Sequence, residues 1–349
     1  RRDWSSDVCS SDLGGVYALL FKKLSITLVI VVTMLFQAVN VFAADVILGG
    51  QSIGIELDYD GVLITGTYDI SIDNKKYNPS SDGYLTGDII KKVNGQSIDS
   101  ISTLMANVEK EIDNKNTITL TLSRDKKELH KELKFQESDG KFTTGLYVQD
   151  GLTGVGTMTY FNPATHHFGA LGHVMMDVSL ESDVIIKKGS VYNSYVKKIN
   201  PSENGKPGEK IAEIGSIQIG TIYDNNNYGI YGNYDDYPSQ DKQIISTASM
   251  DEVEEGEAYF LTVLDGHTLT KCSINITKLK KQNEPSIKGI TFEITDEKVL
   301  SLTNGVVQGM SGSPIIQNGK LIGCVTHVDV NNVHQGYGLY IDWMLENDK

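Results

Sequence analysis

The 349-residue chain has few cysteines and no excess of basic residues, and each shortage excludes a class of protein. Its three cysteines are Cys9, Cys272 and Cys324, too few for a scaffold built on disulfides. Whether Cys272 and Cys324 pair in an oxidising compartment stays open, because spacing along a chain does not show that two side chains are close. The net charge of -14 argues against a nucleic-acid partner, which calls for a basic face.

Motifs that bind metals, phosphates or cofactors are missing as well. The sequence has no cluster of metal-ligand residues, no phosphate-binding glycine loop and no dinucleotide fingerprint. We therefore expect neither a metal nor a cofactor. Hydrophobic residues make up 40% of the chain, which at this length allows two domains and a leader.

The N-terminal region divides into two segments. Residues 1–20 begin with Arg and show no periodicity, so we interpret them as a non-native leader. Lys22 and Lys23 then precede an apolar run over 24–44, which is long enough to cross a bilayer and ends in small residues typical of a signal-peptidase site. Residues 21–44 are expected to be a signal peptide or a membrane anchor, and in both cases the rest of the chain is exported.

Residues 45–137 predict a separate small α+β domain. Strand-like runs are followed by Gly87-Asp88-Ile89-Ile90 and then by apolar residues at helical spacing over 101–112. This segment resembles a PDZ domain. The resemblance implies a loop whose backbone N–H groups bind a peptide carboxylate beside an open strand edge; its residues would be Gly49, Gly50, Ile53 and Gly54.

Residues 142–349 contain many short strands split by turns, which favours a barrel or a sandwich. Within them, Gly309-Met310-Ser311-Gly312-Ser313-Pro314 is typical of a turn that lifts a nucleophilic hydroxyl clear of the backbone. The N–H groups of Gly309 and Ser311 would then point at an oxyanion. The apolar runs joined by Asn318-Gly319 predict a β-hairpin directly after it. An ordinary turn between two strands is the alternative interpretation.

Two histidines compete for the role of general base. His173 follows small and apolar residues and is the candidate, although a packed core histidine is the alternative. His327, on the strand after the predicted hairpin, is its rival. His166 and His167 lie in a polar turn, where we expect them to be solvated.

Several ordered motifs together identify a family. They are Gly49–Gly54, Gly154–Thr157, Gly169–His173, Pro207–Lys210, Gly229–Gly232 and Val307–Pro314. With them, the chain from Val46 to Leu345 closely resembles the stage IV sporulation protein B (SpoIVB) serine peptidases. The resemblance implies a mostly β protein in which the small α+β PDZ domain is followed by a chymotrypsin-like double β-barrel peptidase domain.

The resemblance also implies a catalytic triad. Ser311 is the nucleophile, His173 moves its proton, and Asp296 holds the imidazole in the correct tautomer. The aspartate is the least determined of the three from the residues themselves. Asp177, Asp251 and Asp265 stay open, because all of them keep the order His, Asp, Ser along the chain.

The implied function is that of an exported serine endopeptidase in the space between the forespore membranes. It would cleave a membrane-bound regulatory protein during endospore formation, trigger sigma-factor processing and cleave itself. The PDZ domain would bind a peptide C-terminus or strand, and residues 24–44 would contact the membrane if they are not removed. Two alternatives stay open: a PDZ-containing scaffold on an inactive peptidase fold, and a general envelope quality-control protease.

Overall fold

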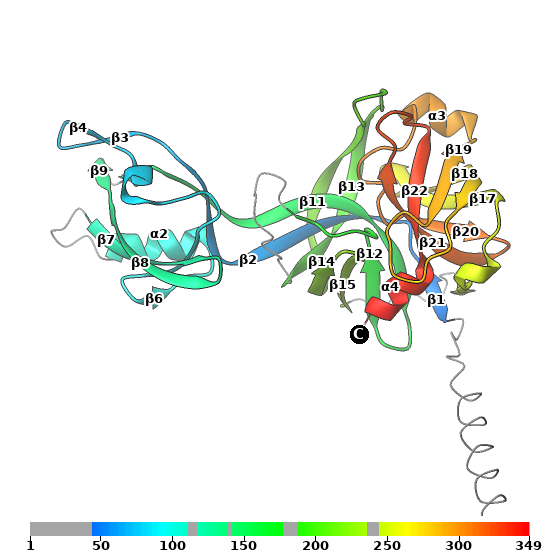
Figure 1. The fold of residues 1–349 in the computed structure, drawn as a ribbon, viewed down its shortest axis with the longest axis horizontal. Helices are drawn as coiled ribbons and strands as arrows, with labels where there is room; N and C mark the ends of the chain where they lie inside the picture. The colour runs from blue at the N-terminus through cyan, green and yellow to red at the C-terminus, as the bar shows by residue number, and fades with distance from the viewer. Residues whose placement is uncertain (1–43, 111–116, 139–140, 177–187, 236–243, 349) are drawn as a thin grey trace, which may run out of the picture. The chain divides into compact units, whose positions relative to one another are not determined.

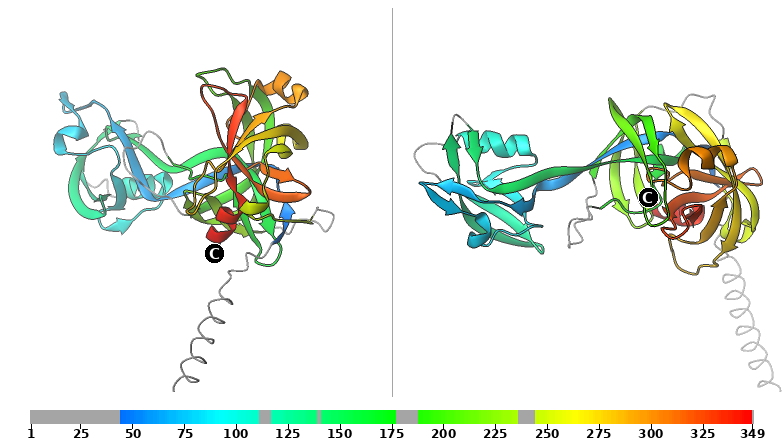
Figure 2. Two further views of the ribbon diagram at one scale, coloured as in Figure 1. Left: turned by 45° about the vertical axis from the view of Figure 1, so that its right-hand side comes forward. Right: turned by 90° about the horizontal axis from the view of Figure 1, so that it is seen from above.

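The computed structural model describes residues 44–110, 117–138, 141–176, 188–235 and 244–348. Apart from Ala44, the expected leader and export segment lie outside them. Within the described residues, none of the helices combines the length and the apolar character needed to span a membrane. The described chain is dominated by antiparallel strands (Figures 1 and 2).

Six strands close a first barrel. In order of pairing they are β2 (Ser52–Thr67), β11 (Leu146–Asn162), β12 (His167–Ala170), β15 (Gly229–Tyr234), β14 (Glu209–Asn226) and β13 (Lys188–Asn200), which pairs back to β2. Alternate residues of β2, namely Ile53, Ile55 and Leu57, are fully buried in its core, as the two-residue period of a strand requires. Strands β1 (Asp45–Leu48) and β16 (Ile244–Ser246) extend the sheet beyond β11.

Six further strands close a second barrel, drawn in yellow to red in Figure 1. They are β17 (Gly256–Asp265), β18 (Thr268–Leu279), β19 (Ile290–Ile294), β22 (Gln335–Tyr340), β21 (Lys320–Val328) and β20 (Pro314–Gln317). The predicted hairpin is confirmed as β20 and β21, with Asn318 and Gly319 at φ values of 50° and 76°, the left-handed angles that a tight hairpin turn needs. The two barrels confirm the expected chymotrypsin-like, mostly β fold.

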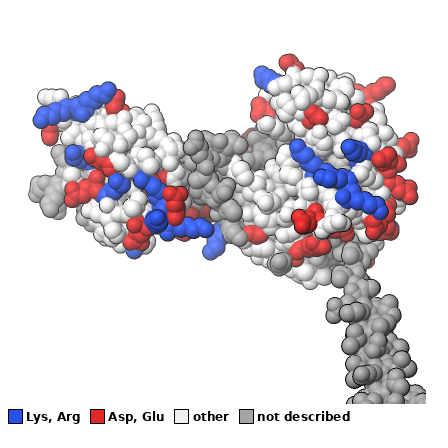
Figure 3. Space-filling view, in the orientation of Figure 1, with Lys and Arg blue, Asp and Glu red and all other residues white. Residues whose placement is uncertain are grey.

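Short helical segments complete this part of the chain. They are η2 (Met250–Glu252), α3 (Glu297–Thr303) and α4 (Ile341–Asn347). Figure 3 shows acidic and basic side chains mixed over the face in view. The basic residues Lys278, Lys280 and Lys281 at and after the end of β18 are exposed, and Lys281 forms an ion pair with Asp251 at 3.3 Å.

A lobe is inserted between β2 and β11. It contains β3 (Ile70–Ile72), β4 (Lys75–Tyr77), η1 (Pro79–Asp82), β5 (Ile89–Val93), β6 (Gln96–Ser97), α2 (Ile101–Lys110), β7 (Thr117–Arg124), β8 (Lys127–Lys134), β9 (Gln136–Ser138) and β10 (Lys141–Thr143). Its core is separate from those of the barrels and includes Ile90 and Leu120. Asp88 is fully buried there and accepts hydrogen bonds from the Arg124 guanidinium and the Leu85 N–H. The lobe is therefore a folded α+β body with its own core.

The expected division into residues 45–137 and 142–349 does not follow the strands. Strand β1 and the first half of β2 pair with β11 and β13 of the first barrel and with β16 at the edge of the same sheet, and residues 43–349 form one compact unit. The inserted lobe begins only near Val62, where β2 changes its partner from β13 to β5. The peptidase fold is therefore discontinuous in sequence, which periodicity within each segment does not show.

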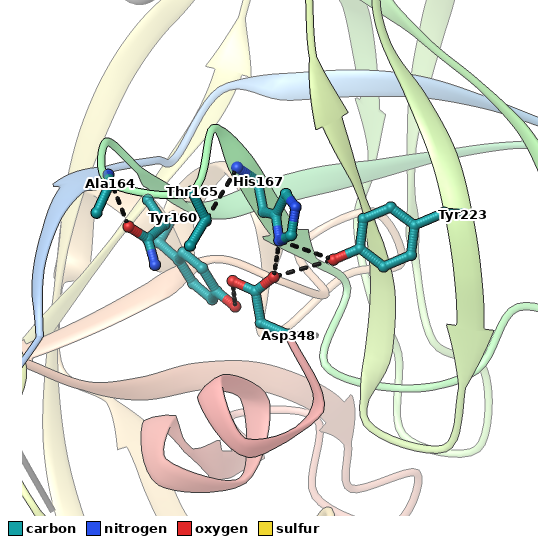
Figure 4. Close-up of polar contacts among 7 residues, drawn as sticks. Tyr160, Ala164, Thr165, His167, Tyr223 and Asp348 are labelled. Carbon is teal, nitrogen blue, oxygen red and sulfur yellow. Dashed lines mark hydrogen bonds and ion pairs between the residues drawn. The ribbon is translucent and has the colours of Figure 1, made fainter.

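A polar cluster joins the end of the chain to the first barrel (Figure 4). The Asp348 carboxylate accepts hydrogen bonds from Tyr160 and Tyr223, each at 3.0 Å, and lies 2.8 Å from Nδ1 of His167. The Asp348 side chain is 3% exposed and that of His167 21%. The expectation that His167 is solvated was therefore wrong; its partner lies 181 positions away.

Candidate active site

Ser311 lies at the tip of the loop 309–314, which we call the nucleophile loop. Gly309 and Gly312 have φ values of 90° and 87°, which residues with a Cβ rarely adopt. A Cβ on Gly312 would overlap the carbonyl oxygen of Thr157 and lie 2.5 Å from the N atom of Leu171. The glycines thus allow the loop to turn sharply while packed against the first barrel.

Strand β11 holds this loop through two buried threonines. The N–H of Thr157 donates to the Ser311 carbonyl at 2.9 Å, and its hydroxyl donates to the Gly309 carbonyl at 2.8 Å. The Thr159 hydroxyl donates to the Gly312 carbonyl at 2.7 Å. Sequence reasoning did not assign these threonines a role, although the motif Gly154–Thr157 marked the strand. Three carbonyls of the loop are therefore fixed by one strand of the opposite barrel.

Two N–H groups of the nucleophile loop have no acceptor among the described residues. They belong to Gly309 and Ser311, whereas the neighbouring N–H groups of Met310 and Gly312 donate to Val307 and Val325. Gly309 and Ser311 are the residues from which the sequence predicted an oxyanion hole. A pair of unused donors beside a serine hydroxyl is the arrangement that such a site requires.

His173 follows two residues in the left-handed region. Leu171 and Gly172 have φ values of 67° and 70°, and this angle is unfavourable for a bulky residue such as leucine. A Cβ on Gly172 would overlap the Sγ of Cys324, and that cysteine is a buried free thiol. The turn is therefore held by close packing on β21, and His173 follows directly after it. Cys272 is likewise buried and free.

The tautomer of His173 follows from its hydrogen bond. Its Nδ1 lies 2.8 Å from the carbonyl oxygen of Val174, which can only accept, so Nδ1 carries the proton and Nε2 is free to take one. Burial lowers the pKa of His173 below its ordinary value, and the Val174 carbonyl opposes this only in part. His173 is therefore a neutral imidazole suited to act as a base.

A cavity of about 840 Å³ brings the candidate residues together. Ser311, His173 and His327 all line it. The Ser311 hydroxyl donates to the Thr326 carbonyl at 3.0 Å, so a rotation about its Cα–Cβ bond is needed to turn it toward a base. Most of the remaining lining is apolar, including Met175, Val306 and Val328.

His327 is close to His173, with ring centroids 5.2 Å apart. Its Nδ1 is buried and has no hydrogen-bond partner within the described structure. Burial lowers the pKa of His327, and together with the charges of His173 and Lys288 it brings that pKa to about 4. His327 is therefore neutral near pH 7, and the rival of the sequence analysis lies inside the same site.

Asp296 does not take the position that the resemblance implied. Its carboxylate caps helix α3 by accepting from the N–H groups of Lys298 and Val299, each at 3.1 Å, and Asp296 does not line the cavity. Among the described residues no carboxylate lines this cavity. Aspartate is a preferred N-cap residue, so the short helix after Asp296 accounts for its presence.

The other aspartates considered are placed as follows. Asp251 forms the exposed ion pair with Lys281, and Asp265 is an exposed residue at the end of β17. Asp177 lies outside the described residues. None of the described alternatives lines the cavity with His173.

The residues expected to form the PDZ carboxylate loop lie in the first barrel. The N–H groups of Gly49 and Gly50 donate to the carbonyls of Thr159 and Met158, so neither is available to a carboxylate. Ile53 and Gly54 are paired on both edges of β2, with β11 and with β13. The open strand edge expected beside the loop is thus occupied by the barrel itself.

Comparison with known proteins gives a family. The family described as SpoIVB peptidase S55 matches residues 140–345. An inactive serine-to-alanine form of Rv3671c from M. tuberculosis H37Rv is 16% identical, over 55% of this chain and 80% of that chain, with a TM-score of 0.33. The active form of the Rv3671c protease is 15% identical, over 57% and 73%, with a TM-score of 0.31. No match was found among curated proteins. Since the matched residues 140–345 are more than half of the chain and include His173 and Ser311, the chain belongs to the SpoIVB peptidase S55 family and is a serine endopeptidase.

Proposed function

We propose that Ser311 and His173 carry out the hydrolysis, with the N–H groups of Gly309 and Ser311 as the oxyanion hole. The observation that carries this proposal is that one cavity is lined by Ser311, by the neutral His173 and by Gly309, and that the N–H groups of Gly309 and Ser311 are unused there. The Val174 carbonyl fixes the tautomer of His173. It performs that part of the role usually given to an aspartate.

The reaction then follows from these positions. Ser311 Oγ attacks the substrate carbonyl carbon while Nε2 of His173 takes its proton, and the oxyanion accepts from Gly309 and Ser311. His173 next gives the proton to the leaving amine, and the peptide bond breaks. A water molecule then attacks the acyl carbon while His173 takes its proton. His173 gives this proton to Ser311 Oγ as the acyl–oxygen bond breaks, and the acyl group leaves as a carboxylic acid.

The cavity indicates the kind of peptide that the enzyme accepts. Its lining beside Ser311 is apolar, and among the described residues it includes no Asp, Glu, Lys or Arg. A charged side chain would lose its hydration there without gaining a partner. The substrate therefore carries an aliphatic side chain next to the scissile bond.

The physiological substrate is a membrane-associated regulatory protein cleaved during endospore formation, with sigma-factor processing as the result. Membership of the SpoIVB family supports this role, and the apolar run over 24–44 after two lysines supports export to the space between the forespore membranes. The inserted lobe, which carries the PDZ-like Gly87-Asp88-Ile89-Ile90 motif and its own core, serves to select the substrate. Self-cleavage near the leader belongs to the same proposal.

Intact-mass analysis after treatment with a fluorophosphonate tests the chemistry. We expect one adduct on the wild-type chain and on Ser301→Ala, whose serine is exposed on α3, but none on Ser311→Ala or His173→Ala. An adduct on His173→Ala that is lost in His327→Ala would transfer the role of base to His327. A folded wild-type chain without an adduct would favour the scaffold alternative.

Sequencing of protein N-termini during sporulation tests the biological role. Cells with the wild-type chain are compared with cells carrying Ser311→Ala, and one new N-terminus on a membrane protein is expected only in the former. Rapid digestion of casein by the purified chain would instead support general quality control. Matching N-termini on the purified wild-type and Ser311→Ala chains would argue against self-cleavage.

A further inference from the structure

Lys210 is a buried lysine that the proposed reaction does not use. It lies near the start of β14, in the motif Pro207–Lys210, and is only 6% exposed. Its amine donates a 2.6 Å hydrogen bond to the hydroxyl of Thr262 on β17, which is itself fully buried. No ion pair of Lys210 with a carboxylate occurs in the described part of the chain. A lysine amine thus reaches into the second barrel with a neutral hydroxyl as its partner.

Such burial is unfavourable for the charged amine. A buried ammonium without a carboxylate loses most of its hydration energy, and a side chain that stays buried at this cost often has a function. Methionine, of similar length and unbranched, would fill the same space without the cost. Burial lowers the pKa of Lys210 to about 7, so the amine changes charge near neutral pH.

The titratable group that faces the amine is the thiol of Cys272 on β18. Burial raises the pKa of that thiol far above its ordinary value, and the charge of Asp296 raises it further. Cys272 is therefore neutral across the range in which Lys210 titrates. Among the described residues, the protonated amine is then a positive charge without an ion-pair partner.

This lysine is in direct contact with the nucleophile loop. A Cβ built on Gly309 would lie 3.1 to 3.3 Å from three carbons of the Lys210 stem, so the stem covers the Cα of Gly309. The N–H of Lys210 donates to the Gln308 carbonyl at 2.9 Å, and the N–H of Gln308 donates to the Gly208 carbonyl at 2.8 Å. The peptide that supplies the Gly309 N–H is therefore fixed from behind by the segment that carries Lys210.

We propose that Lys210 is a positioning residue for the oxyanion hole: its stem and backbone fix the Gly309 peptide, and its buried ammonium adds positive potential behind the two N–H donors. The proposal rests on the proposed function of Gly309 and Ser311. Lys210 does not line the cavity, so it acts through the loop and does not touch the substrate. The charge that develops on the oxyanion is stabilised by the ammonium, which raises kcat more than it changes KM.

The test compares Lys210→Met with the wild-type chain and with Lys278→Met, which removes an exposed lysine from β18 of the second barrel. Hydrolysis of a peptide thioester with valine next to the scissile bond is measured from pH 5 to 9, together with thermal unfolding. We expect Lys210→Met to lower kcat about tenfold with little change in KM, less than the ~10²–10³ expected for losing an oxyanion donor. Lys278→Met is expected to match the wild type.

Two further readouts separate a positioning role from a structural one. The wild-type kcat is expected to decline as the pH rises above about 7, where Lys210 loses its proton, and Lys210→Met is expected to lack that decline. Lys210→Met should also unfold at the same temperature as the wild type or higher, because a costly buried amine has been removed. A wild-type kcat and pH profile in Lys210→Met, or a loss of folding in that variant, would overturn the proposal. A wild-type chain without any hydrolysis would overturn the proposed function as well.

Discussion

The rings of His173 and His327 lie 5.2 Å apart in one cavity, and neither ring has a carboxylate partner within the described structure. Burial lowers the pKa of both imidazoles, and the charge of His173 lowers that of His327 further. Both rings are therefore neutral near pH 7, and a charge on His173 opposes a charge on His327.

The first prediction concerns the acid limb of activity. Because the pKa of His173 is lowered from 6.5, the base stays neutral to a lower pH than an ordinary histidine. The rate of fluorophosphonate labelling is expected to have its acid midpoint below pH 6.5 in the wild-type chain. His327→Phe is expected to keep this midpoint, since His327 is neutral above about pH 4. A midpoint at or above 6.5, or an upward shift in His327→Phe, would contradict this.

The second prediction concerns acid stability. The folded-state pKa of His327 is about 4, below the ordinary 6.5, so the unfolded chain binds more protons in that window. Stability is therefore lost as the pH falls from about 6.5 toward 4. Thermal unfolding is measured at pH 7 and at pH 4.5. The drop in Tm between the two pH values should be smaller in His327→Phe than in the wild-type chain, by a few degrees. An equal loss in both chains would show that His327 does not contribute.

The third prediction separates the two interpretations of Asp296. As the cap of α3, it is well replaced by asparagine, which caps helices equally well. Asp296→Asn is expected to keep near-wild-type labelling and stability, and Asp296→Ala to lose about 1 kcal/mol with labelling retained. If Asp296→Asn loses activity by orders of magnitude in a folded chain, the triad implied by the family resemblance is correct.

The fourth prediction compares two glycines at positive φ. Gly312→Ala places a Cβ against the Thr157 carbonyl, whereas a Cβ on Gly319 meets nothing within 4 Å. We expect Gly312→Ala to lose at least ~4 kcal/mol and all labelling, and Gly319→Ala to lose only ~1–2 kcal/mol. Denaturant unfolding and labelling measure both. Equal effects would mean that the packing of the nucleophile loop on β11 is not required.

The fifth prediction concerns the cluster in Figure 4. Asp348→Ala leaves the hydroxyls of Tyr160 and Tyr223 without their acceptor, and a buried unsatisfied hydroxyl costs ~1–3 kcal/mol. The matched control is Asp329→Ala, which removes a partly exposed carboxylate that accepts from the Tyr337 hydroxyl and is expected to cost less than Asp348→Ala. Denaturant unfolding gives both values. A smaller loss for Asp348→Ala than for Asp329→Ala would contradict the role of burial.

Local patterns in the sequence predicted the parts of the structure that are made locally. Asn318-Gly319 defines its own turn, so the hairpin after Ser311 was predicted correctly. Helix α2 begins at Ile101 as its apolar spacing indicated. The two glycines of the nucleophile loop likewise have the positive φ that the motif suggested.

The features that the sequence did not predict depend on contacts between residues that are far apart along the chain. The N–H groups of Gly49 and Gly50 donate to the carbonyls of Thr159 and Met158, and His167 contacts the Asp348 carboxylate. Each partner is more than a hundred positions away in the sequence. Asp296 was different, because an aspartate before a short apolar helix is a readable capping signal. The family resemblance implies a triad aspartate at the same position.

Insertion of the lobe also bears on how the first barrel forms. Ile55 of β2 must pair with Gly154 and Val191, and closing such long loops of chain costs conformational entropy and slows folding. The lobe has its own core, and its folding brings Leu63 beside Gln149. The barrel halves of β2 and β11 then begin as neighbours, and we expect the folded lobe to assist the closing of the first barrel. Changes that unfold the lobe are expected to slow the refolding of the peptidase even where they leave the native site intact.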